Sequence, residues 1–182
     1  WFKRYEPDAY KRIGSVLLIK DYVKYYLTGV LASDFTDMGG SSLLDQAKGN
    51  FSRELLDIYG ISEILGALPP LSRSFDVIGK VTPEAAQMAG LAAGTPVVGG
   101  MIDVVASALG AGVHQAGQAC IVCGSWSINE IVTAEPRTAP HIFMTIPYAV
   151  PGLWMIIEAS AASASNLEWF VKHFCAEERA EA

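Results

Sequence analysis

The stretch that decides the fold reads Pro96-Val97-Val98-Gly99-Gly100-Met101-Ile102-Asp103. Its apolar start predicts a buried strand over 96–102 that runs into a bend at the paired glycines. Asp103 then predicts the first residue of a helix through Leu109, which ends at Gly110-Ala111-Gly112. A strand, a bend, an acid and a helix in this order are typical of the ligand-bearing units of α/β sheets.

Asp103 is the only charged residue between Glu84 and Glu130, apart from any charge on His114. One interpretation is a helix cap, in which the carboxylate accepts backbone N–H bonds and stabilises the helix by about 0.5–2 kcal/mol. The other is a catalytic base, because Gly99 and Gly100 lack Cβ atoms and let a ligand approach the strand end. Both interpretations stay open at this point.

A second candidate is Gly124-Ser125-Trp126-Ser127, which separates two β-rich runs over 118–123 and 128–133. The default interpretation is an ordinary hairpin turn. The alternative is a phosphate site, in which Gly124 permits tight backbone geometry and backbone N–H groups and two serine hydroxyls hold phosphate oxygens. Trp126 argues against a plain turn, because a large aromatic side chain at a tip usually packs against another group.

Apolar spacing and capping residues predict the other elements. They are amphipathic helices over 19–27 and 165–174, capped helices over 52–59 and 82–90, and strands over 76–81, 142–146 and 153–157. The segment 32–42 is dense in small hydroxyl, carboxylate and glycine residues, which predicts a structured loop. Asp34 and Asp37 in this loop are expected to fix its backbone in preference to binding a metal.

Composition limits the class of protein. The chain has 182 residues, 51% of them hydrophobic and 18% charged, which excludes intrinsic disorder. The formal net charge of −6 leaves no basic stripe for nucleic acid. The apolar stretch 89–113 is interrupted by Pro96 and six glycines, so we expect no membrane span.

Three cysteines do not form an even disulfide framework, so we expect a reducing, cytoplasmic setting. Cys120 and Cys123 have metal-like spacing, but in a strand their thiols point to opposite faces, so no metal site is expected. The three histidines are scattered and lack companions at ligand spacing. The chain begins at Trp1 without an initiator Met, and we expect it to be a piece of a longer protein.

Several motifs occur together in one order along nearly the whole chain. They are Asp21-Tyr22-Val23-Lys24-Tyr25-Tyr26-Leu27-Thr28-Gly29, Asp34-Phe35-Thr36-Asp37, Ser41-Ser42-Leu43-Leu44-Asp45, Gly79-Lys80-Val81-Thr82-Pro83-Glu84-Ala85-Ala86, Gly94-Thr95-Pro96-Val97 and Gly99-Gly100-Met101-Ile102-Asp103. In this order they resemble the middle of the FGGY carbohydrate kinases. The run Cys123-Gly124-Ser125-Trp126-Ser127 is similar to the second phosphate motif of that family, with Ser125 keeping the hydroxyl of the usual threonine.

The resemblance implies an α/β, ribonuclease-H-like (actin-like ATPase) fold with parts of two domains. Residues 1–112 would end the N-terminal sugar-kinase domain, and residues 113–182 would begin the C-terminal nucleotide-binding domain. The Asp-x-Gly-Thr phosphate loop and the later glycine-rich adenosine motif of the family are missing from this sequence. The resemblance therefore implies that this piece alone is inactive.

The resemblance also implies ATP-dependent phosphorylation of a ketose, with a pentulose such as L-xylulose as the expected substrate and ATP and Mg²⁺ as cofactors. Asp103 would be the general base, Gly124, Ser125, Trp126 and Ser127 would bind phosphate, and Gly100 and Met101 would line the substrate cleft. A homodimer is a further expectation. The alternative is a non-catalytic sugar-binding or regulatory relative with an actin-like fold.

Overall fold

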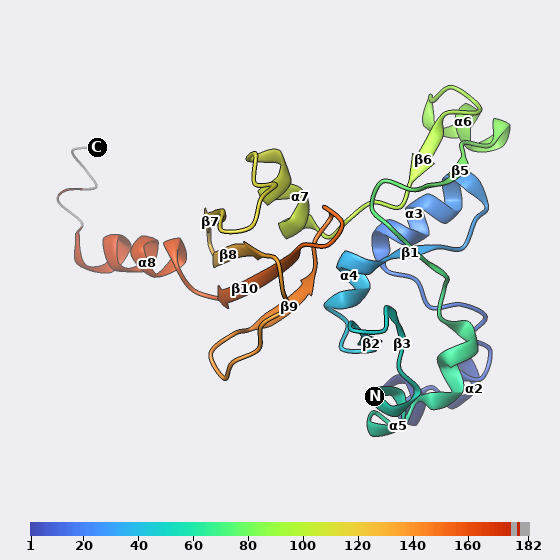
Figure 1. The fold of residues 1–182 in the computed structure, drawn as a ribbon, viewed down its shortest axis with the longest axis horizontal. Helices are drawn as coiled ribbons and strands as arrows, with labels where there is room; N and C mark the ends of the chain where they lie inside the picture. Colours follow the sequence, from blue (N-terminus) through green and yellow to red (C-terminus); the bar gives the residue numbers. More distant parts are fainter. Residues whose placement is uncertain (176–177, 179–182) are drawn as a thin grey trace. The chain divides into compact units, whose positions relative to one another are not determined.

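The computed structural model describes residues 1–175 and 178, and the chain divides into two compact units. The N-terminal unit spans Trp1–Ile102, and the C-terminal unit spans Asp103–Ala182 (Figure 1). This division precedes residue 112, where the resemblance places a domain boundary, and that boundary stays a prediction. Within the described residues, no helix is long and apolar enough to cross a membrane.

The N-terminal unit combines short helices with three small two-stranded sheets. Its elements are α1 (Phe2–Tyr5), α2 (Pro7–Tyr10), α3 (Ile19–Thr28), β1 (Ser33–Asp34), α4 (Phe35–Gly39), β2 (Leu44–Asp45), β3 (Asn50–Phe51), α5 (Arg53–Ile58), the 3-10 helix η1 (Ser62–Ala67), β4 (Leu71–Ser72), β5 (Val77–Lys80), α6 (Pro83–Ala89) and β6 (Pro96–Val98). Strand β1 pairs in parallel with β4, whereas β2 with β3 and β5 with β6 are antiparallel.

The capped helices of this unit begin where the sequence predicts. The Ser52 hydroxyl accepts the N–H of Leu55 at the start of α5, and the Thr82 hydroxyl accepts the N–H of Ala85 at the start of α6. Helix α6 ends at Gly90, whose φ of +67° is left-handed and therefore suits glycine. Its buried alanines pack with Val81, Leu27 and Val97 into a small apolar core.

Helix α3 begins at the predicted residue and ends one residue later than predicted, and much of its apolar stripe is exposed. Ile19 is 88% exposed and Tyr22 is 59% exposed. The buried residues of the helix are instead Asp21 and Lys24. The physical reason is a set of ion pairs beneath the helix, described below, which satisfies both charges and lets the polar side face inward.

The structured loop predicted over 32–42 is partly regular structure. Residues Ser33–Asp34 form β1, and Phe35–Gly39 form α4. The Asp34 side chain accepts the N–H groups of Thr36 and Asp37 and so caps α4. Carboxylates in this position favour a helix start as readily as a turn, which explains why composition alone did not separate the two. The expectation that Asp34 fixes the local backbone is confirmed.

Strand β6 is shorter and less buried than predicted. It ends at Val98, and Val98 is 42% exposed. Its described sheet partner is β5, in a ladder whose register shifts between Val77 and Gly79. A two-stranded ribbon covers little of the surface of either strand, so the apolar character of residues 96–98 does not lead to burial in this chain.

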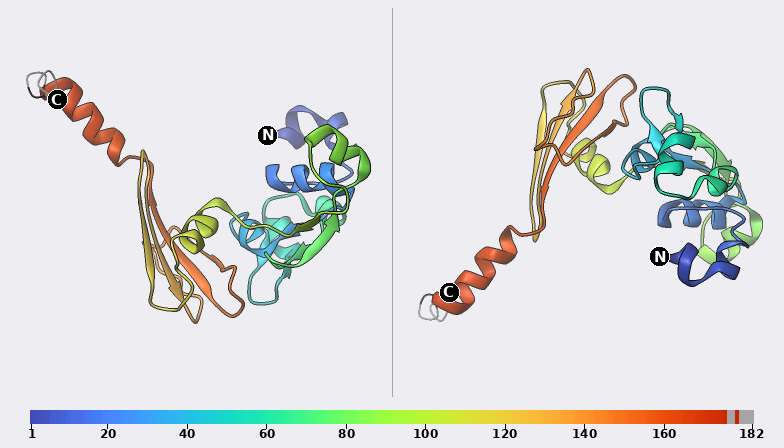
Figure 2. Two further views of the ribbon diagram at one scale, coloured as in Figure 1. Left: turned by 90° about the horizontal axis from the view of Figure 1, so that it is seen from above. Right: turned by 90° about the horizontal axis from the view of Figure 1, so that it is seen from below.

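The C-terminal unit is built on one antiparallel sheet in the order β7-β8-β10-β9. Its elements are α7 (Asp103–Gly110), β7 (Ala119–Cys123), β8 (Ser127–Thr133), β9 (Met144–Pro147), β10 (Trp154–Ser160) and α8 (Ala164–Phe174). Val132 lies opposite Met155, and Met155 lies opposite Ile146, and all three are fully buried. Helix α7 lies beside the sheet (Figure 2), with Val105 and Ala108 fully buried.

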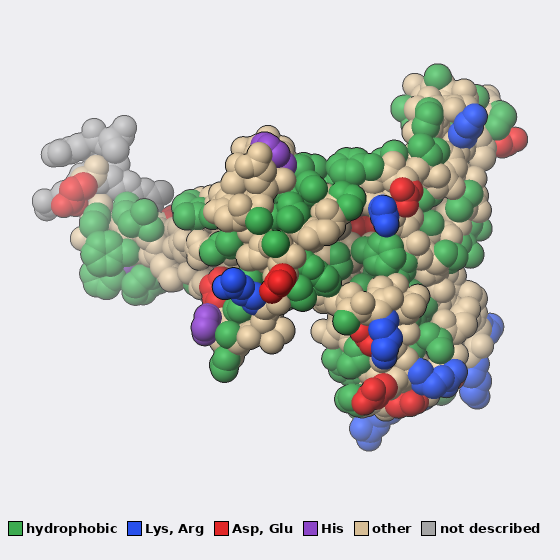
Figure 3. Space-filling model, in the orientation of Figure 1, with side chains coloured by type: hydrophobic (Ala, Val, Ile, Leu, Met, Phe, Trp, Pro, Cys, Tyr) green, Lys and Arg blue, Asp and Glu red, His purple; other side chains and the backbone are tan. Residues whose placement is uncertain are grey.

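The predicted hairpin, the two later strands and the final helix are all confirmed, but the apolar stripe of α8 is not buried. Leu167 and Phe174 are each 65% exposed. Figure 3 shows hydrophobic side chains covering this helix. The aromatic rings contact one another instead, with Phe170 and Phe174 stacked at a centroid distance of 5.2 Å.

Candidate functional site

The bend before Asp103 requires both of its glycines. A Cβ atom added to Gly99 would lie 2.3 Å from the carbonyl oxygen of Arg73 and 2.5 Å from the hydroxyl of Ser72. Gly100 has a φ of +78°, in the left-handed region that favours glycine. Close packing therefore requires glycine at position 99 and the left-handed backbone favours it at position 100, in addition to any role that the missing Cβ atoms have in ligand approach.

A buried ion cluster lies beside this bend in the N-terminal unit. The Lys20 ammonium is 2.7 Å from Asp21, 2.5 Å from Asp34 and 3.1 Å from Asp37. The Lys24 ammonium is 2.9 Å from Asp21. The side chains of Asp21 and Asp34 are fully buried. Two ammonium groups thus face three carboxylates, and Lys20 and Asp37 are the partly exposed members of the cluster.

Hydrogen bonds decide the charge states in this ion cluster. Burial alone would raise the pKa of Asp21, but bonds from Lys20, Ser33 and Lys24 outweigh burial and lower its pKa. Burial alone would lower the pKa of Lys20, but its bonds to Asp21 and Asp34 raise it. Asp37 differs, because burial raises its pKa and the opposing effect of Lys20 does not compensate. Lys20 and Asp21 are therefore held as an ion pair.

Two side chains of this region bond directly to the bend. The Lys24 ammonium donates to the carbonyl oxygen of Gly99. The N–H of Ile102 donates to the Thr36 hydroxyl oxygen at 2.9 Å, and that hydroxyl donates to Asp34 Oδ1 at 2.5 Å. Sequence reasoning did not find these contacts. The signal was present, because Lys20, Asp21 and Lys24 occupy one helix that also carries an apolar stripe.

Asp103 is the first residue of α7, and its side chain is exposed. Its Oδ1 accepts the N–H of Val104 at 2.8 Å, so the carboxylate interacts with the first turn of its own helix. A capping side chain accepts an N–H two or three residues further on, so this bond to the next residue does not establish the capping interpretation. An exposed carboxylate has further acceptor positions, so the same side chain retains capacity to accept a proton from a ligand. The role of general base stays a prediction.

The segment from Gly124 to Ser127 is the tip of the β7–β8 hairpin, with Cys123 paired to Ser127. The Gly124 N–H donates to the Trp126 carbonyl at 3.0 Å. The carbonyls of Gly124 and Ser125 accept N–H groups of Ala164 and Ser163, at the start of α8. The strand ladder and the helix start therefore both hold the tip in place.

Two details of the tip differ from expectation. A Cβ atom at Gly124 would lie at an ordinary contact distance of 3.6 Å from the Trp126 carbonyl oxygen, so tight backbone geometry does not require this glycine. Trp126 is 52% exposed, so most of its ring surface is not packed. Ser125 is also exposed, and Ser127 is half-buried. The phosphate-binding role of these four residues stays a prediction.

Glu130 is a further residue that sequence reasoning missed. It lies on β8, opposite Cys120 on β7 and Ile157 on β10, and it is 1% exposed. Burial raises the pKa of Glu130 to about 7, where the neighbouring Cys120 thiol opposes the rise and the charge of Asp103 adds to it. The run Ser127–Thr133 reads as an ordinary β-strand, and a lone acid in such a run gave no indication of its burial.

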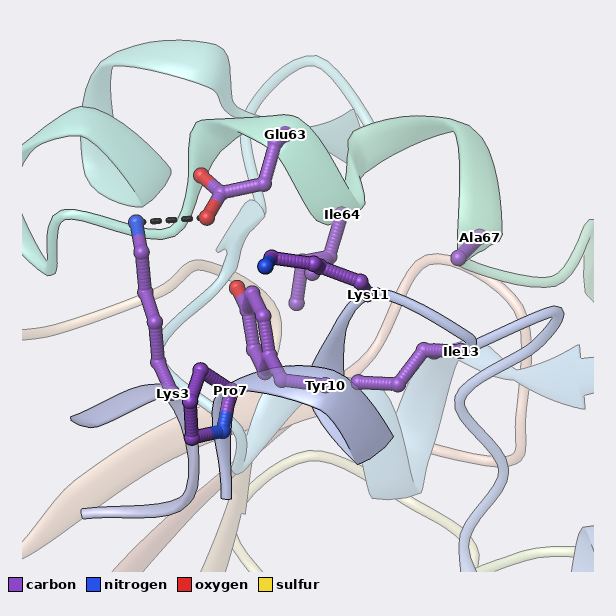
Figure 4. A pocket seen from close by; sticks show the side chains of 8 residues that line it. All are labelled: Lys3, Pro7, Tyr10, Lys11, Ile13, Glu63, Ile64 and Ala67. Carbon is purple, nitrogen blue, oxygen red and sulfur yellow. Dashed lines mark ion pairs between the residues drawn. The ribbon is translucent and has the colours of Figure 1, made fainter. Parts of the chain in front are cut away.

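The remaining predicted residues, Gly100 and Met101, are both half-buried and lie in the bend. A separate cavity of about 470 Å³ lies at the other end of the N-terminal unit, between α1, α2 and η1 (Figure 4). Lys3, Tyr10 and Glu63 contribute polar groups to its wall, and Lys3 pairs with Glu63 at 2.5 Å. None of its lining residues is a predicted site residue.

Comparison with known proteins identifies the family. Residues 1–110 match the model of the N-terminal domain of the FGGY family of carbohydrate kinases. The chain belongs to this family. The resemblance that the motifs indicated is therefore confirmed, and the FGGY match covers the ion cluster, the bend and all of α7.

Individual FGGY kinases match almost the whole chain. A probable L-xylulose kinase of Pasteurella multocida is 40% identical over 96% of this chain. An autoinducer-2 kinase of Yersinia enterocolitica is 35% identical over 98% of it. The crystal structure of xylulose kinase from Rhodospirillum rubrum superposes on 97% of the chain with a TM-score of 0.89 and 31% identity.

These matches confirm the α/β, actin-like ATPase fold that the resemblance implied. The chain covers 36% of the Pasteurella kinase, 34% of the Yersinia kinase and 36% of the Rhodospirillum structure. It thus spans about a third of the length of the FGGY relatives that it matches.

Proposed function

We propose that this chain is the central part of an ATP-dependent sugar kinase that phosphorylates a ketose, with L-xylulose as the first substrate to test. The observation that carries the proposal is the 40% identity to a probable L-xylulose kinase over 96% of the chain. Residues 1–112 would belong to the sugar-binding domain, and residues 113–182 would begin the nucleotide-binding domain.

In this proposal, Asp103 is the general base. Its exposed carboxylate accepts the proton of the sugar hydroxyl as the hydroxyl oxygen bonds to the γ-phosphorus of MgATP. The bond between that phosphorus and the bridging oxygen breaks in the same step, and MgADP leaves with the electron pair. Because the transition state of phosphoryl transfer is stabilised largely by position and charge, a well-placed base is one of the main contributions available to this chain.

The proposed role of the hairpin tip is to bind phosphate of the second substrate, MgATP. The hydroxyl of Ser125 is exposed, and Gly124 leaves open the space that a Cβ atom would fill. Anchoring of the tip by the α8 start keeps these groups in place before nucleotide arrives. A fixed set of donors costs less reorganisation when charge develops on the phosphoryl group.

Gly100 and Met101, which follow Gly99 in the bend before Asp103, are proposed to line the sugar cleft. The class of sugar is the finer part of the proposal. An L-xylulose kinase and an autoinducer-2 kinase match the chain with 40% and 35% identity, so both substrates belong in the first assay panel.

The test uses the full-length protein with MgATP, L-xylulose, D-xylulose and autoinducer-2, with ADP release as the readout. We expect turnover with at least one of these substrates. We expect Asp103→Asn to lower kcat by about 10²- to 10⁴-fold. The asparagine keeps Oδ1 and thus the bond to Val104, so the fold and its thermal midpoint should stay unchanged.

Unchanged turnover in Asp103→Asn would contradict the assignment of the base. Calorimetric titration with each sugar, with and without MgATP, separates the kinase from a non-catalytic binder. A protein that binds sugar in both titrations but releases no ADP would contradict the kinase proposal. The 182-residue chain alone is expected to show no phosphorylation.

A further inference from the structure

The bend over Gly99–Ile102 is held at each end by a side chain from a distant part of the N-terminal unit. Its backbone also bonds to backbone, from Gly99 N–H to the Asp76 carbonyl and from Gly100 N–H to the Ser74 carbonyl, both at 2.9 Å. The Gly99 carbonyl at one end accepts a bond from Lys24, and the Ile102 N–H at the other end donates to Thr36. The bend is therefore fixed from both sides.

The Thr36 hydroxyl is oriented for this contact. It is 1% exposed, and its proton is directed to Asp34 Oδ1 at 2.5 Å. Because the single hydroxyl proton is used in that bond, a lone pair of the oxygen is left for the N–H of Ile102. Asp34 is in turn held by Lys20 at 2.5 Å. The Thr36 oxygen lone pair that accepts the Ile102 N–H is thus held in one orientation.

Lys24 is fixed in a similar way. Its ammonium is 2.9 Å from Asp21, and Asp21 also pairs with Lys20 at 2.7 Å and accepts the Ser33 hydroxyl at 2.5 Å. A buried lysine paired and bonded on several sides has little freedom to move. Through Lys20, the two contacts to the bend share one ion cluster, so they respond to the same set of charges.

We propose that Lys24 and Thr36 are positioning residues for phosphoryl transfer, which hold the Gly99–Ile102 bend so that the next residue, Asp103, is carried on a rigid segment of chain. This inference rests on the proposed function, in which Asp103 is the base. A base must lie within hydrogen-bond reach of the hydroxyl that it deprotonates, and a displacement of about 1 Å costs about 10²-fold in rate. Neither Lys24 nor Thr36 needs to touch substrate for this effect.

The decisive variants in the full-length kinase are Thr36→Val and Thr36→Ser. Valine keeps the shape of threonine but removes the acceptor of the Ile102 N–H, whereas serine keeps the hydroxyl. We expect Thr36→Val to lower kcat by about 10²-fold while KM for MgATP changes less than about threefold. We expect Thr36→Ser to restore kcat to within a few-fold of the wild type.

Thr28→Val is the matched control. Thr28 also uses one hydroxyl for two bonds in this unit, donating to the Lys24 carbonyl at 2.7 Å and accepting the Val30 N–H at 3.1 Å. Among the described residues, the Thr28 hydroxyl makes no bond to the bend. We expect a comparable loss of thermal stability with unchanged kcat. Equal losses of kcat in Thr36→Val and Thr28→Val would overturn the inference, because a general stability effect would then explain both.

A second measurement does not depend on catalysis. Hydrogen exchange of the Ile102 amide should be faster in Thr36→Val than in the wild type and Thr28→Val, because its acceptor is lost. Unchanged exchange would contradict the proposed contact. If Thr36→Val does not fold, Lys24→Met removes the other contact, and wild-type kcat in that variant overturns the inference.

The outcomes also separate this inference from the proposed function. If the wild type releases no ADP with any of the sugars, the kinase proposal fails, and if Asp103→Asn retains full activity, the base assignment fails, whatever Thr36→Val shows. If Asp103→Asn is inactive while a folded Thr36→Val keeps wild-type kcat, the base assignment stands and only the positioning role fails.

Discussion

Glu130 lies directly opposite Cys120 in the β7–β8 ladder, and its carboxylate is buried. Among the described residues, neither carboxylate oxygen has a hydrogen-bond partner. Cys120, Asp103 and Tyr148 are the titratable groups that face it. Burial, followed by the charge of Glu130, raises the pKa of Tyr148 to about 12, and Tyr148 donates its hydroxyl to the Val113 carbonyl at 2.6 Å. The charge of Glu130 therefore adds to the effect of burial on Tyr148.

This burial predicts a stability that falls as pH rises. The pKa of Glu130 is raised from 4.5 to about 7 in the folded state, so the folded chain binds the proton more tightly than the unfolded chain. The resulting stabilisation is complete below pH 4.5 and is lost as pH rises through about 7. From pH 5 to pH 8, we expect this group to lower the free energy of unfolding by about 2–3 kcal/mol.

Urea denaturation at the two pH values measures this loss. Glu130→Gln should remove most of the pH dependence, whereas Glu158→Gln, on the exposed face of β10, should leave it as it is. A pH dependence that survives in Glu130→Gln would show that another group causes it.

Breaking the buried ion cluster should destabilise the N-terminal unit strongly. Lys20→Met leaves Asp21, Asp34 and Asp37 with Lys24 as the one remaining ammonium group of the cluster. Loss of one partner from a buried ion pair costs about 3 kcal/mol or more in free energy of unfolding. Thermal and urea denaturation would measure the change.

The matched control for this prediction is Lys3→Met, which removes the exposed ion pair to Glu63 at 2.5 Å. Water screens that pair, so its loss should leave the stability nearly unchanged. Similar effects of the two substitutions would contradict the importance of burial at Lys20.

Gly99→Ala should distort the bend. Its added Cβ would meet the Arg73 carbonyl oxygen at 2.3 Å, and this oxygen belongs to the backbone and cannot rotate away. Overpacking of this kind costs about 1–3 kcal/mol in stability. We expect lower thermal stability and lower kcat together. Gly14→Ala is the control, because an added Cβ there has no atom within 4 Å, and it should change neither quantity.

Gly124→Ala should separate stability from ligand binding. The added Cβ would make only an ordinary 3.6 Å contact, so the thermal midpoint should stay within about a degree of the wild type. If the tip binds phosphate, the methyl group occupies the space of the ligand, and KM for MgATP should rise by about tenfold or more. An unchanged KM would argue for an ordinary hairpin tip.

Local sequence signals predicted much of the secondary structure. Thr82, Pro83 and Gly90 set both ends of α6, and the alternating runs around residues 124–127 gave the hairpin and its tip. These signals act between neighbours in sequence, through capping bonds and restricted backbone angles, so they can be read without knowledge of the fold. The order of the motifs also predicted the FGGY family, which the comparison confirmed.

The candidate site was predicted less completely. Asp103 is exposed at a helix start as expected, but nothing in its neighbourhood in sequence indicated Thr36 or Lys24, which bond to the bend before it. Helix α3 was read by hydrophobic periodicity, which assumes that charged side chains face water. That assumption fails when the charges pair with each other below the helix.

The sequence by itself determined most of the longer elements, the caps of α5 and α6 and the family, because each depends on residues close together in the chain or on a specific order of short motifs. Only the tertiary structure decided which face of α3 is buried, what holds the Gly99–Ile102 bend and how deeply Glu130 lies. Those features arise from contacts between residues far apart in sequence, and the energy of a charge depends on which partners and how much water surround it.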